Sequence, residues 1–126
     1  MKIQMASIIM ISLVLMLALS ACGAVNDIKA AGDAGKAFMT TLKDGDAAAS
    51  WNMLTPALQN EIGDEADWAE WITMRKFSEW KFDSTEISGD EAQLSGKGTV
   101  DGVEYGVILV LDRTGETWKV SGINIE

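Results

Sequence analysis

The sequence predicts an α+β fold in which N-terminal helices pack on a curved, four-stranded antiparallel meander. Before Phe77 the apolar residues recur with a helical period, and after it they alternate with polar residues in the period of a β-strand. The Asp101-Gly102 dipeptide between two alternating segments is the strongest hairpin signal in the chain. Helices followed by a run of strands joined by short turns indicate an α+β domain.

The first helix of the domain is expected from about Asp27 to Lys43. A polar stripe with spacings of three and four residues predicts it, and the opposite side is apolar. The stripe consists of Lys29, Asp33, Lys36, Thr40 and Lys43, and the apolar side of Ala31, Ala34, Phe38 and Leu42. Gly45 is the natural residue to end this helix, because glycine adopts the left-handed conformation at little cost.

Three shorter helices follow, each with its own start signal. Asp46, Thr55 and Asp64 are expected N-caps, since their side-chain oxygens can accept hydrogen bonds from free backbone N–H groups. Pro56 suits the first position of the middle helix. The last helix should end with Arg75-Lys76 in its final turn, and its expected inward residues are Trp68, Trp71 and Ile72.

Four strands complete the domain. The first contains Trp80 and Phe82 and runs to about Ile87, before a turn at Gly89-Asp90. The second and third flank the Asp101-Gly102 turn, and the third is apolar on both faces in its second half, so it should be central and covered on both sides. The fourth, from Thr117 to Ile125, needs a bulge near Ser121-Gly122 to bring its apolar residues onto one face.

The first 22 residues have the pattern of a secretory signal peptide. A short positive start at Lys2 precedes an apolar run from Ile8 to Leu19, and small residues follow. The final Leu19-Ser20-Ala21-Cys22 resembles the lipobox of bacterial lipoproteins. The resemblance implies that residues 1–21 are removed and that Cys22 is acylated as the first mature residue. Cys22 is the only cysteine, so no disulfide can form within the chain.

The expected organisation is therefore a signal-peptide helix over 1–21, a lipidated cysteine and short tether over 22–29, and one domain over 30–126. Two alternatives remain for the first segment: an uncleaved membrane anchor, for which the apolar run is nearly long enough, and a plain secreted form. Lipidation of Cys22 would place the domain on the extracytoplasmic side of the bacterial cell envelope. Gly23, rather than an aspartate, follows the cysteine, and the resemblance to bacterial lipoproteins implies sorting to the outer membrane where one exists.

Composition excludes several classes of function. Without Lys2 the chain has 9 basic and 19 acidic residues, a net charge of −10. Such a surface repels nucleic acid, so we expect no nucleic-acid partner. The sequence contains no histidine, which removes the usual proton shuttle and the commonest zinc ligand. We expect no cofactor and no metal, because the acidic residues around Asp64 match no calcium loop and are explained as a helix start.

The element order is similar to the nuclear-transport-factor-2-like (NTF2-like) fold, the cone-shaped superfamily that includes ketosteroid isomerase and SnoaL-type cyclases. More narrowly, the chain looks like small bacterial lipoproteins of that superfamily whose domains have no assigned function. The likeness covers roughly Asp33 to Ile125, although four strands are few for a complete cone. The residues that carry it are Leu42-Lys43-Asp44-Gly45-Asp46, Ala49 to Trp51, Leu54-Thr55-Pro56, Asp101-Gly102, Trp118-Lys119-Val120 and Ile123. Enzymes of the superfamily use an aspartate or histidine base inside the cone, and no matching motif is present here, so no catalytic residue is carried over.

The candidate ligand-binding residues are Trp71, Trp80, Tyr105 and Leu94. Two of them, Trp71 and Trp80, stand at the junction of helices and sheet, where an aromatic cleft is expected. A bend at Gly96 and Gly98 would open a pocket floored by Tyr105 and Leu94. The remaining tryptophans occupy core positions of their elements and are expected to pack there: Trp51, Trp68 and Trp118.

Three functional hypotheses follow. The first is a lipid-anchored domain of the cell envelope that binds a protein partner or a small apolar ligand without catalysis, with Cys22 attaching it to the membrane. The second is an isomerase or dehydratase that uses a buried carboxylate with Tyr105; it requires a carboxylate inside an apolar cavity. The third is a structural accessory protein of the envelope.

Overall fold

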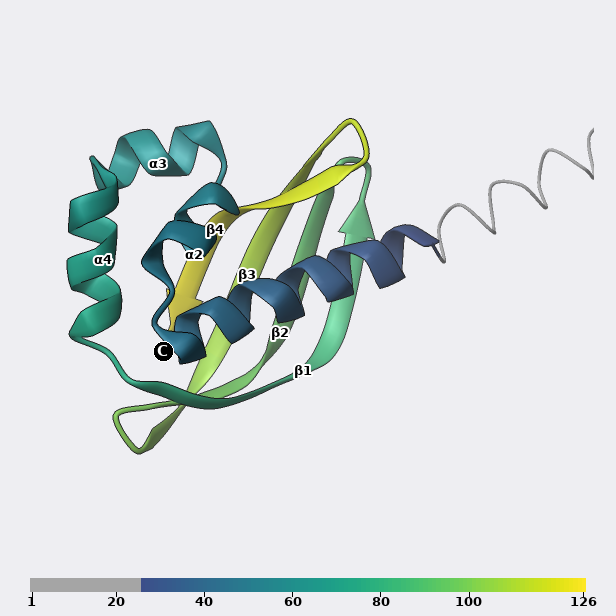
Figure 1. The fold of residues 1–126 in the computed structure, drawn as a ribbon. Helices are drawn as coiled ribbons and strands as arrows, with labels where there is room; N and C mark the ends of the chain where they lie inside the picture. The colour runs from purple at the N-terminus through teal and green to yellow at the C-terminus, as the bar shows by residue number, and fades with distance from the viewer. Residues whose placement is uncertain (1–25) are drawn as a thin grey trace, which may run out of the picture.

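A computed structural model describes residues 26–126, and the expected signal peptide and Cys22 lie outside this range. A helix covers residues 26–44, so residues 26–29 of the expected tether are helical. Three short helices follow, α2 (Ala47–Asn52), α3 (Pro56–Ile62) and α4 (Glu65–Thr73). Figure 1 shows the N-terminal helix lying across one face of a curved sheet, with α2, α3 and α4 grouped at one end of the domain. No helix within residues 26–126 is long and apolar enough to cross a membrane.

The sheet is a four-stranded antiparallel meander in the order β1-β2-β3-β4, as predicted. Its strands are β1 (Phe77–Ser88), β2 (Glu91–Val100), β3 (Val103–Thr114) and β4 (Thr117–Ile125). The turn between β2 and β3 has φ of 52° at Asp101 and 82° at Gly102. Two positive φ values in succession define the turn type that matches the twist of a hairpin, which is why this dipeptide was a reliable signal.

The predicted helix starts are confirmed by their hydrogen bonds. The side chains of Asp46, Thr55 and Asp64 accept from backbone N–H groups three residues ahead, at 3.1, 3.2 and 2.8 Å. The predicted end of α4 is wrong by about two residues, since Met74 is its C-cap and Arg75-Lys76 lie beyond it. Arg75 nevertheless satisfies that end, because its Nη1 donates to the carbonyl oxygen of Trp71 at 3.1 Å.

The register of β4 confirms the predicted bulge. Val110 pairs with Gly122 and Leu111 with Val120, so Ser121 is the extra residue. The bulge lets Val120 and Ile123 both face the helices. β3 is central as predicted, but its alternate residues differ in burial: Leu109 is fully buried, whereas Ile108 on the other face is half-buried. The expectation that β3 is covered on both sides is therefore wrong, because the described helices pack on one face of the sheet.

The core lies between the N-terminal helix and the sheet. Gly35 faces the sheet at the point of closest approach, where a Cβ atom would collide with the side chain of Leu94. The buried residues that meet there include Phe38, Leu42, Leu94, Leu109 and Leu111. Glycine at this position lets the helix approach the sheet closely, and it explains why Leu94 is completely covered.

Ser50 is the only polar side chain in the buried class among residues 26–126. Its Oγ accepts a hydrogen bond from Nε1 of Trp68 at 2.7 Å and donates to the carbonyl oxygen of Asp46 at 2.9 Å. A buried indole N–H without an acceptor would be costly, so this pair joins α4 to α2 with both groups satisfied.

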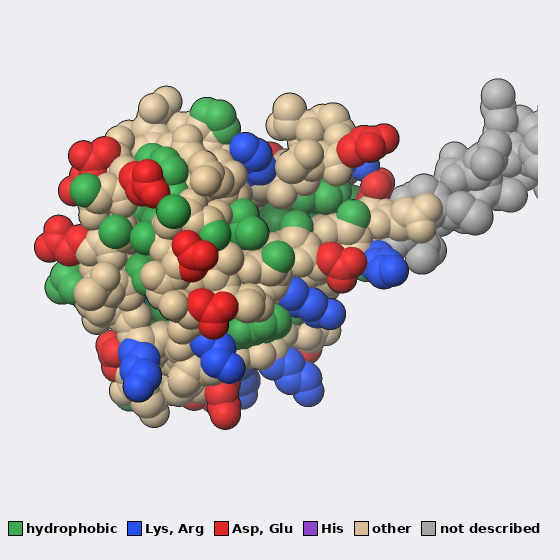
Figure 2. Space-filling view, viewed as in Figure 1, with side chains coloured by type: hydrophobic (Ala, Val, Ile, Leu, Met, Phe, Trp, Pro, Cys, Tyr) green, Lys and Arg blue, Asp and Glu red, His purple; other side chains and the backbone are tan. Residues whose placement is uncertain are grey.

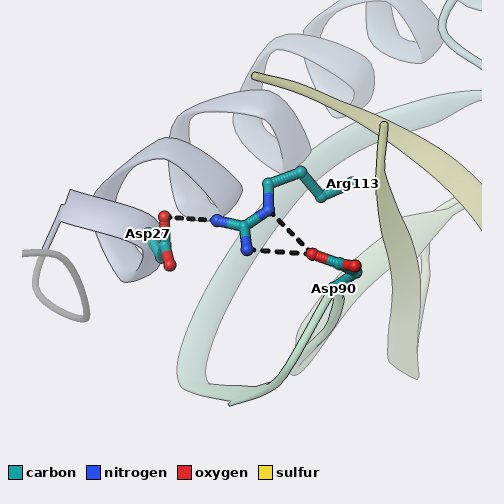
Figure 3. A network of polar contacts seen from close by, with 3 residues as sticks. All are labelled: Asp27, Asp90 and Arg113. Carbon is teal, nitrogen blue, oxygen red and sulfur yellow. Dashed lines mark hydrogen bonds and ion pairs between the residues drawn. The ribbon is translucent and has the colours of Figure 1, made fainter. Parts of the chain in front are cut away.

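Arg113 on β3 links the start of the N-terminal helix to the turn between β1 and β2 (Figure 3). Its guanidinium donates to Asp27 at 2.7 Å and to Asp90 at 2.9 and 3.1 Å, and it lies 5.3 Å from the ring centre of Trp118. Hydrogen bonds to Asp90 and then to Asp27 raise the pKa of Arg113 above its ordinary value. As far as the titration of Arg113 itself is concerned, the corresponding stabilisation is present below the ordinary pKa of arginine and is lost as the pH rises through the raised one.

Candidate functional site

The four candidate ligand residues fall into three places. Trp71 and Tyr105 line one hollow, at the end of the domain where α4 meets the turn between β2 and β3. Trp80 lines a separate hollow at the edge of the sheet. Leu94 is fully buried beneath Gly35 in the core, away from Trp71. In the register of the sheet, Val107 stands between Tyr105 and Leu109, the partner of Leu94, so Tyr105 and Leu94 do not floor a common pocket.

The hollow that brings Trp71 and Tyr105 together has a volume of about 350 Å³. Apolar side chains from β2 and β4 and one charged side chain from each of two loops complete its lining: Val100, Ile123, Ile125, Arg75 and Asp101. Two hydrogen bonds hold its rim. The backbone N–H of Asp101 donates to the carbonyl oxygen of Lys76, and the backbone N–H of Lys76 donates to the side-chain Oδ1 of Asp101, both at 2.9 Å. The residues after α4 are thereby fixed to the hairpin.

A second hollow lies on the other side of Trp71. Its volume is about 500 Å³, and α3, α4 and the bulge of β4 form its walls. Trp71 and Ile123 belong to both hollows, so together they divide one cleft into two parts. The remaining lining of the second part includes the apolar residues Leu58, Ile62 and Trp68 and two exposed acids, Glu61 and Asp67. We call the two parts together the Trp71 cleft.

Trp71 is held in a ladder of stacked side chains. Phe38 and Trp68 have ring centres 6.2 Å apart, and Trp68 and Trp71 have ring centres 5.0 Å apart with planes inclined by only 11°. The guanidinium carbon of Arg75 lies 4.4 Å from the centre of the Trp71 ring. The ladder therefore runs from the buried Phe38 to a half-buried cation at the cleft, and each member is fixed by the one beneath it.

The hollow at Trp80 has a different character. It is larger, about 630 Å³, and it contains three lysines and three acids: Lys43, Lys81, Lys97, Asp44, Glu79 and Glu104. Trp80 and Lys97 point to opposite faces of the sheet by register, so this hollow wraps around a sheet edge and is not an enclosed cavity. Its one ion pair, Lys97 to Glu104 at 3.4 Å, is well exposed. We conclude that it is an open, solvated groove that carries many charged side chains.

The acidic residues of the described chain stay at the surface. Every aspartate and glutamate from residue 26 onward is exposed or half-buried, and no group of three or more His, Cys, Asp or Glu residues in that range could hold a metal ion. Figure 2 shows acidic and basic side chains interspersed over the face that it draws, with apolar surface between them. Tyr105 therefore has no buried carboxylate near it among the described residues, which the isomerase hypothesis would require.

The fold is NTF2-like, as comparison with solved structures shows. An NTF-2-like protein of unknown function from Silicibacter pomeroyi matches 82% of this chain and 98% of its own length, with 14% identity and a TM-score of 0.63. A DUF4783 family protein from Bacteroides ovatus matches 69% of this chain and 88% of its own, with 14% identity and a TM-score of 0.55. An NTF2-like protein of unknown function from Cytophaga hutchinsonii covers 76% and 89%, with 11% identity and a TM-score of 0.53.

These similarities confirm the expected relation to NTF2-like domains of unassigned function, and at such identities they establish the fold alone. No protein-family model matches the sequence, and the comparison with curated proteins finds no match. The site must therefore be argued from the residues of this chain.

Sequence patterns did not reveal five residues of the smaller hollow as site residues: Arg75, Val100, Asp101, Ile123 and Ile125. Arg75 was assigned to a helix end, Asp101 to a turn, and Ile123 to a strand face, and each of them has that local role as well. One sequence signal could have identified Arg75. It follows Trp71 by four residues, the spacing at which side chains of a helix meet.

Proposed function

We propose that this protein is a lipid-anchored domain of the bacterial cell envelope that binds a small apolar ligand in the Trp71 cleft without catalysing a reaction. The observation that carries the proposal is the cleft itself. A fixed aromatic side chain, Trp71, stands between a smaller hollow of about 350 Å³ with a mixed polar and apolar lining and a larger, mainly apolar hollow of about 500 Å³. Small-molecule sites typically have such volumes, and they combine apolar walls with a few polar groups.

Binding suits the observed chemistry better than acid–base catalysis does. NTF2-like folds include enzymes, so the fold itself does not decide between the two. An isomerase of the expected type needs a carboxylate kept in an apolar cavity, where burial would hold its proton near neutral pH. The only carboxylate in the smaller hollow, that of Asp101, is exposed and accepts a backbone hydrogen bond from Lys76.

The proposed anchor would leave the cleft accessible. The N-terminal helix covers residues 26–44 and is about 28 Å long at 1.5 Å per residue. Figure 1 shows α4 at the end of the domain away from the start of the N-terminal helix. With Cys22 lipidated only four residues before the helix, the Trp71 cleft would lie at the end of the domain farther from the membrane attachment.

A protein partner is the second candidate, and the rim of the cleft favours it. Met74 and Val103 are the most exposed large apolar residues of the described chain, with 69% and 52% of their surfaces accessible. Met74 directly precedes Arg75, and Val103 pairs with Val100, so both stand beside the smaller hollow. A partner that covers this end would bury them.

The anchoring is tested by mass spectrometry of the chain extracted from bacterial membranes. We expect an N-terminal acylated Cys22, and we expect a Cys22→Ala chain to keep residues 1–21 and to carry no acyl group. Recovery of an unmodified Cys22 in soluble protein would contradict the anchoring but would leave the Trp71 cleft unaffected.

Ligand binding is tested by isothermal titration calorimetry with uncharged aromatic and alkyl alcohols. The chain purified from cells is compared with its Trp71→Ala and Trp80→Ala variants. If the chain is held in nanodiscs, titration into empty nanodiscs gives the blank. Binding that is lost in Trp71→Ala and kept in Trp80→Ala supports the proposal. Equal binding by all three, or none by the unmodified chain, contradicts it. Chemical conversion of a bound probe, followed by mass spectrometry, would favour the isomerase alternative.

A further inference from the structure

We propose that the ligand of the Trp71 cleft is an apolar molecule with a carboxylate group, and that Arg75 binds this carboxylate. The inference rests on the proposed function, because it specifies the chemical class of molecule that the same cleft takes. It makes Arg75 the residue that determines specificity, while Trp71 and the apolar walls accept the rest of the molecule.

The position of Arg75 is fixed before any ligand arrives. Its guanidinium lies over the Trp71 ring, with the central carbon 4.4 Å from the ring centre. Its Nη1 donates to the carbonyl oxygen of Trp71 at 3.1 Å, and its backbone N–H donates to the carbonyl oxygen of Ile72 at the same distance. A guanidinium that is stacked and hydrogen-bonded in this way loses little further freedom when it binds a ligand.

Arg75 also retains unused binding capacity. A guanidinium has five N–H donors, and the hydrogen bond to Trp71 is the only one that its side chain makes within residues 26–126. No carboxylate of the described chain lies within 4.0 Å of it, although the side chain is half-buried. The two parallel donors of an arginine fork match the two oxygens of a carboxylate, which makes this the natural group to complete the site.

The walls around Arg75 suit the apolar part of such a molecule. Val100, Ile123 and Ile125 present aliphatic surface, and Trp71 and Tyr105 present aromatic surface, within the same hollow of about 350 Å³. Apolar contacts on one side and a single cation on the other would orient an amphipathic anion in one direction. An uncharged molecule of the same shape would gain only the apolar contacts.

Three carboxylates of the cleft oppose this assignment. Glu61 and Asp67 line only the larger hollow and are exposed, whereas Asp101 lines the hollow that contains Arg75, and its position limits its effect. Its carboxylate lines the same hollow, but Oδ1 accepts the backbone N–H of Lys76 at 2.9 Å. The residue is exposed, so water screens its charge from a ligand. Its removal should therefore tighten the binding of an anion to a small extent.

The test compares 3-phenylpropanoate with 3-phenylpropanol, which have similar shapes and differ in charge. Calorimetry of the full chain should show that the carboxylate binds more tightly. Arg75→Gln should lower the affinity for the carboxylate probe by about tenfold to a hundredfold, the range expected for hydrogen bonds to a charged group. It should leave the affinity for the alcohol unchanged. Lys36→Gln changes the net charge equally on an exposed helix position and is the matched control. Asp101→Asn should raise the affinity for the carboxylate probe by about twofold to fivefold.

Equal affinity of the two probes, or an equal loss of both in Arg75→Gln, would overturn the carboxylate assignment and leave the apolar cleft intact. Binding of neither probe to the unmodified chain would contradict the proposed ligand function itself. Arg75→Lys separates charge from geometry: a loss similar to that of Arg75→Gln supports recognition by the planar fork, and full retention of affinity overturns it. Thermal unfolding of each variant shows whether it is folded.

Discussion

Two arginines, one at each end of the sheet, have similar surroundings but differ in how many hydrogen bonds their guanidinium groups make. Both are half-buried and both stack on a tryptophan, Arg113 on Trp118 at 5.3 Å and Arg75 on Trp71 at 4.4 Å. Arg113 donates to two carboxylates, whereas Arg75 donates to one backbone carbonyl and to no carboxylate of the described chain. Arg113, which bonds to two carboxylates, joins parts of the fold, whereas Arg75, which has N–H donors to spare, faces a hollow.

The comparison separates a structural cation from an available one. Arg113 brings together a helix and a turn that are 86 and 23 residues away in sequence, so its contacts stabilise tertiary structure. The contacts of Arg75 are local, since its partner Trp71 is four residues away. If the comparison is right, substitutions around Arg113 should mainly change stability, and substitutions around Arg75 should mainly change binding.

The largest expected effects come from the tryptophans beneath the two arginines. Trp118→Ala should lower the free energy of unfolding by about 3–5 kcal/mol, because the ring is almost fully buried. Trp71→Ala should cost roughly 1–3 kcal/mol, since this ring is half-buried and loses its stacking on Trp68. Urea unfolding followed by circular dichroism measures both.

Conservative variants show whether ring packing accounts for these losses. Trp118→Phe and Trp71→Phe keep an aromatic ring and should recover part of the stability at each position. A larger loss for Trp71→Ala than for Trp118→Ala would mean that the Trp71 ladder belongs to the core, and the distinction between the two ends would fail.

The second effect in size concerns the arginines themselves. Arg113→Gln should lower the midpoint of thermal unfolding by several degrees, because Asp27 and Asp90 lose their common partner. Arg75→Gln should leave the midpoint nearly unchanged, since glutamine can still donate to a carbonyl and no carboxylate loses a partner. Differential scanning calorimetry of the two variants and the parent chain makes the comparison. Equal losses would show that Arg75 is as structural as Arg113.

The fold was predictable because most of its signals are local. A cap such as Asp46 acts on an N–H group three residues away, and the Asp101-Gly102 turn depends on two successive residues. The bulge at Ser121 was also accessible, since a break in the alternation of apolar residues requires an extra residue. The end of α4 was missed because Arg75 reaches back to the helix from beyond it.

The candidate site was predictable only in part because long-range pairing builds it. The sequence indicated that Trp71 and Tyr105 were candidates, but it did not show that the end of α4 docks on the turn at Asp101. Leu94 was a candidate because it shares the face of its strand with Gly96 and Gly98, where a bend was expected to open a pocket. It is buried instead, because Gly35, nearly sixty residues earlier, lets the helix approach the sheet. The Arg113 network joins three distant segments and leaves no pattern in the sequence.

A smaller effect separates the two carboxylates of the Arg113 network. Asp27 is 33% exposed and Asp90 is 77% exposed, although Asp90 makes the larger number of hydrogen bonds with Arg113. Asparagine keeps an oxygen acceptor at either position, so the two variants differ in the charge that is removed, and water screens the more exposed charge of Asp90 more strongly. Asp27→Asn should therefore lower the midpoint of thermal unfolding more than Asp90→Asn does. The reverse order would show that the number of hydrogen bonds outweighs burial at this end.

The smallest expected effect is a dependence on salt, and its sign needs two opposing contributions. Sodium chloride screens the repulsion among the excess acidic residues, and this stabilises every variant. It also screens the attraction within the Arg113 network, and this weakens the contribution of that network to stability. The stability difference between the parent chain and Arg113→Gln should therefore shrink as salt rises, while the difference for Arg75→Gln should stay flat. Unfolding midpoints at low and high salt test this. A difference for Arg113→Gln that stays constant would mean that stacking on Trp118, rather than its ion pairs, accounts for the contribution of Arg113.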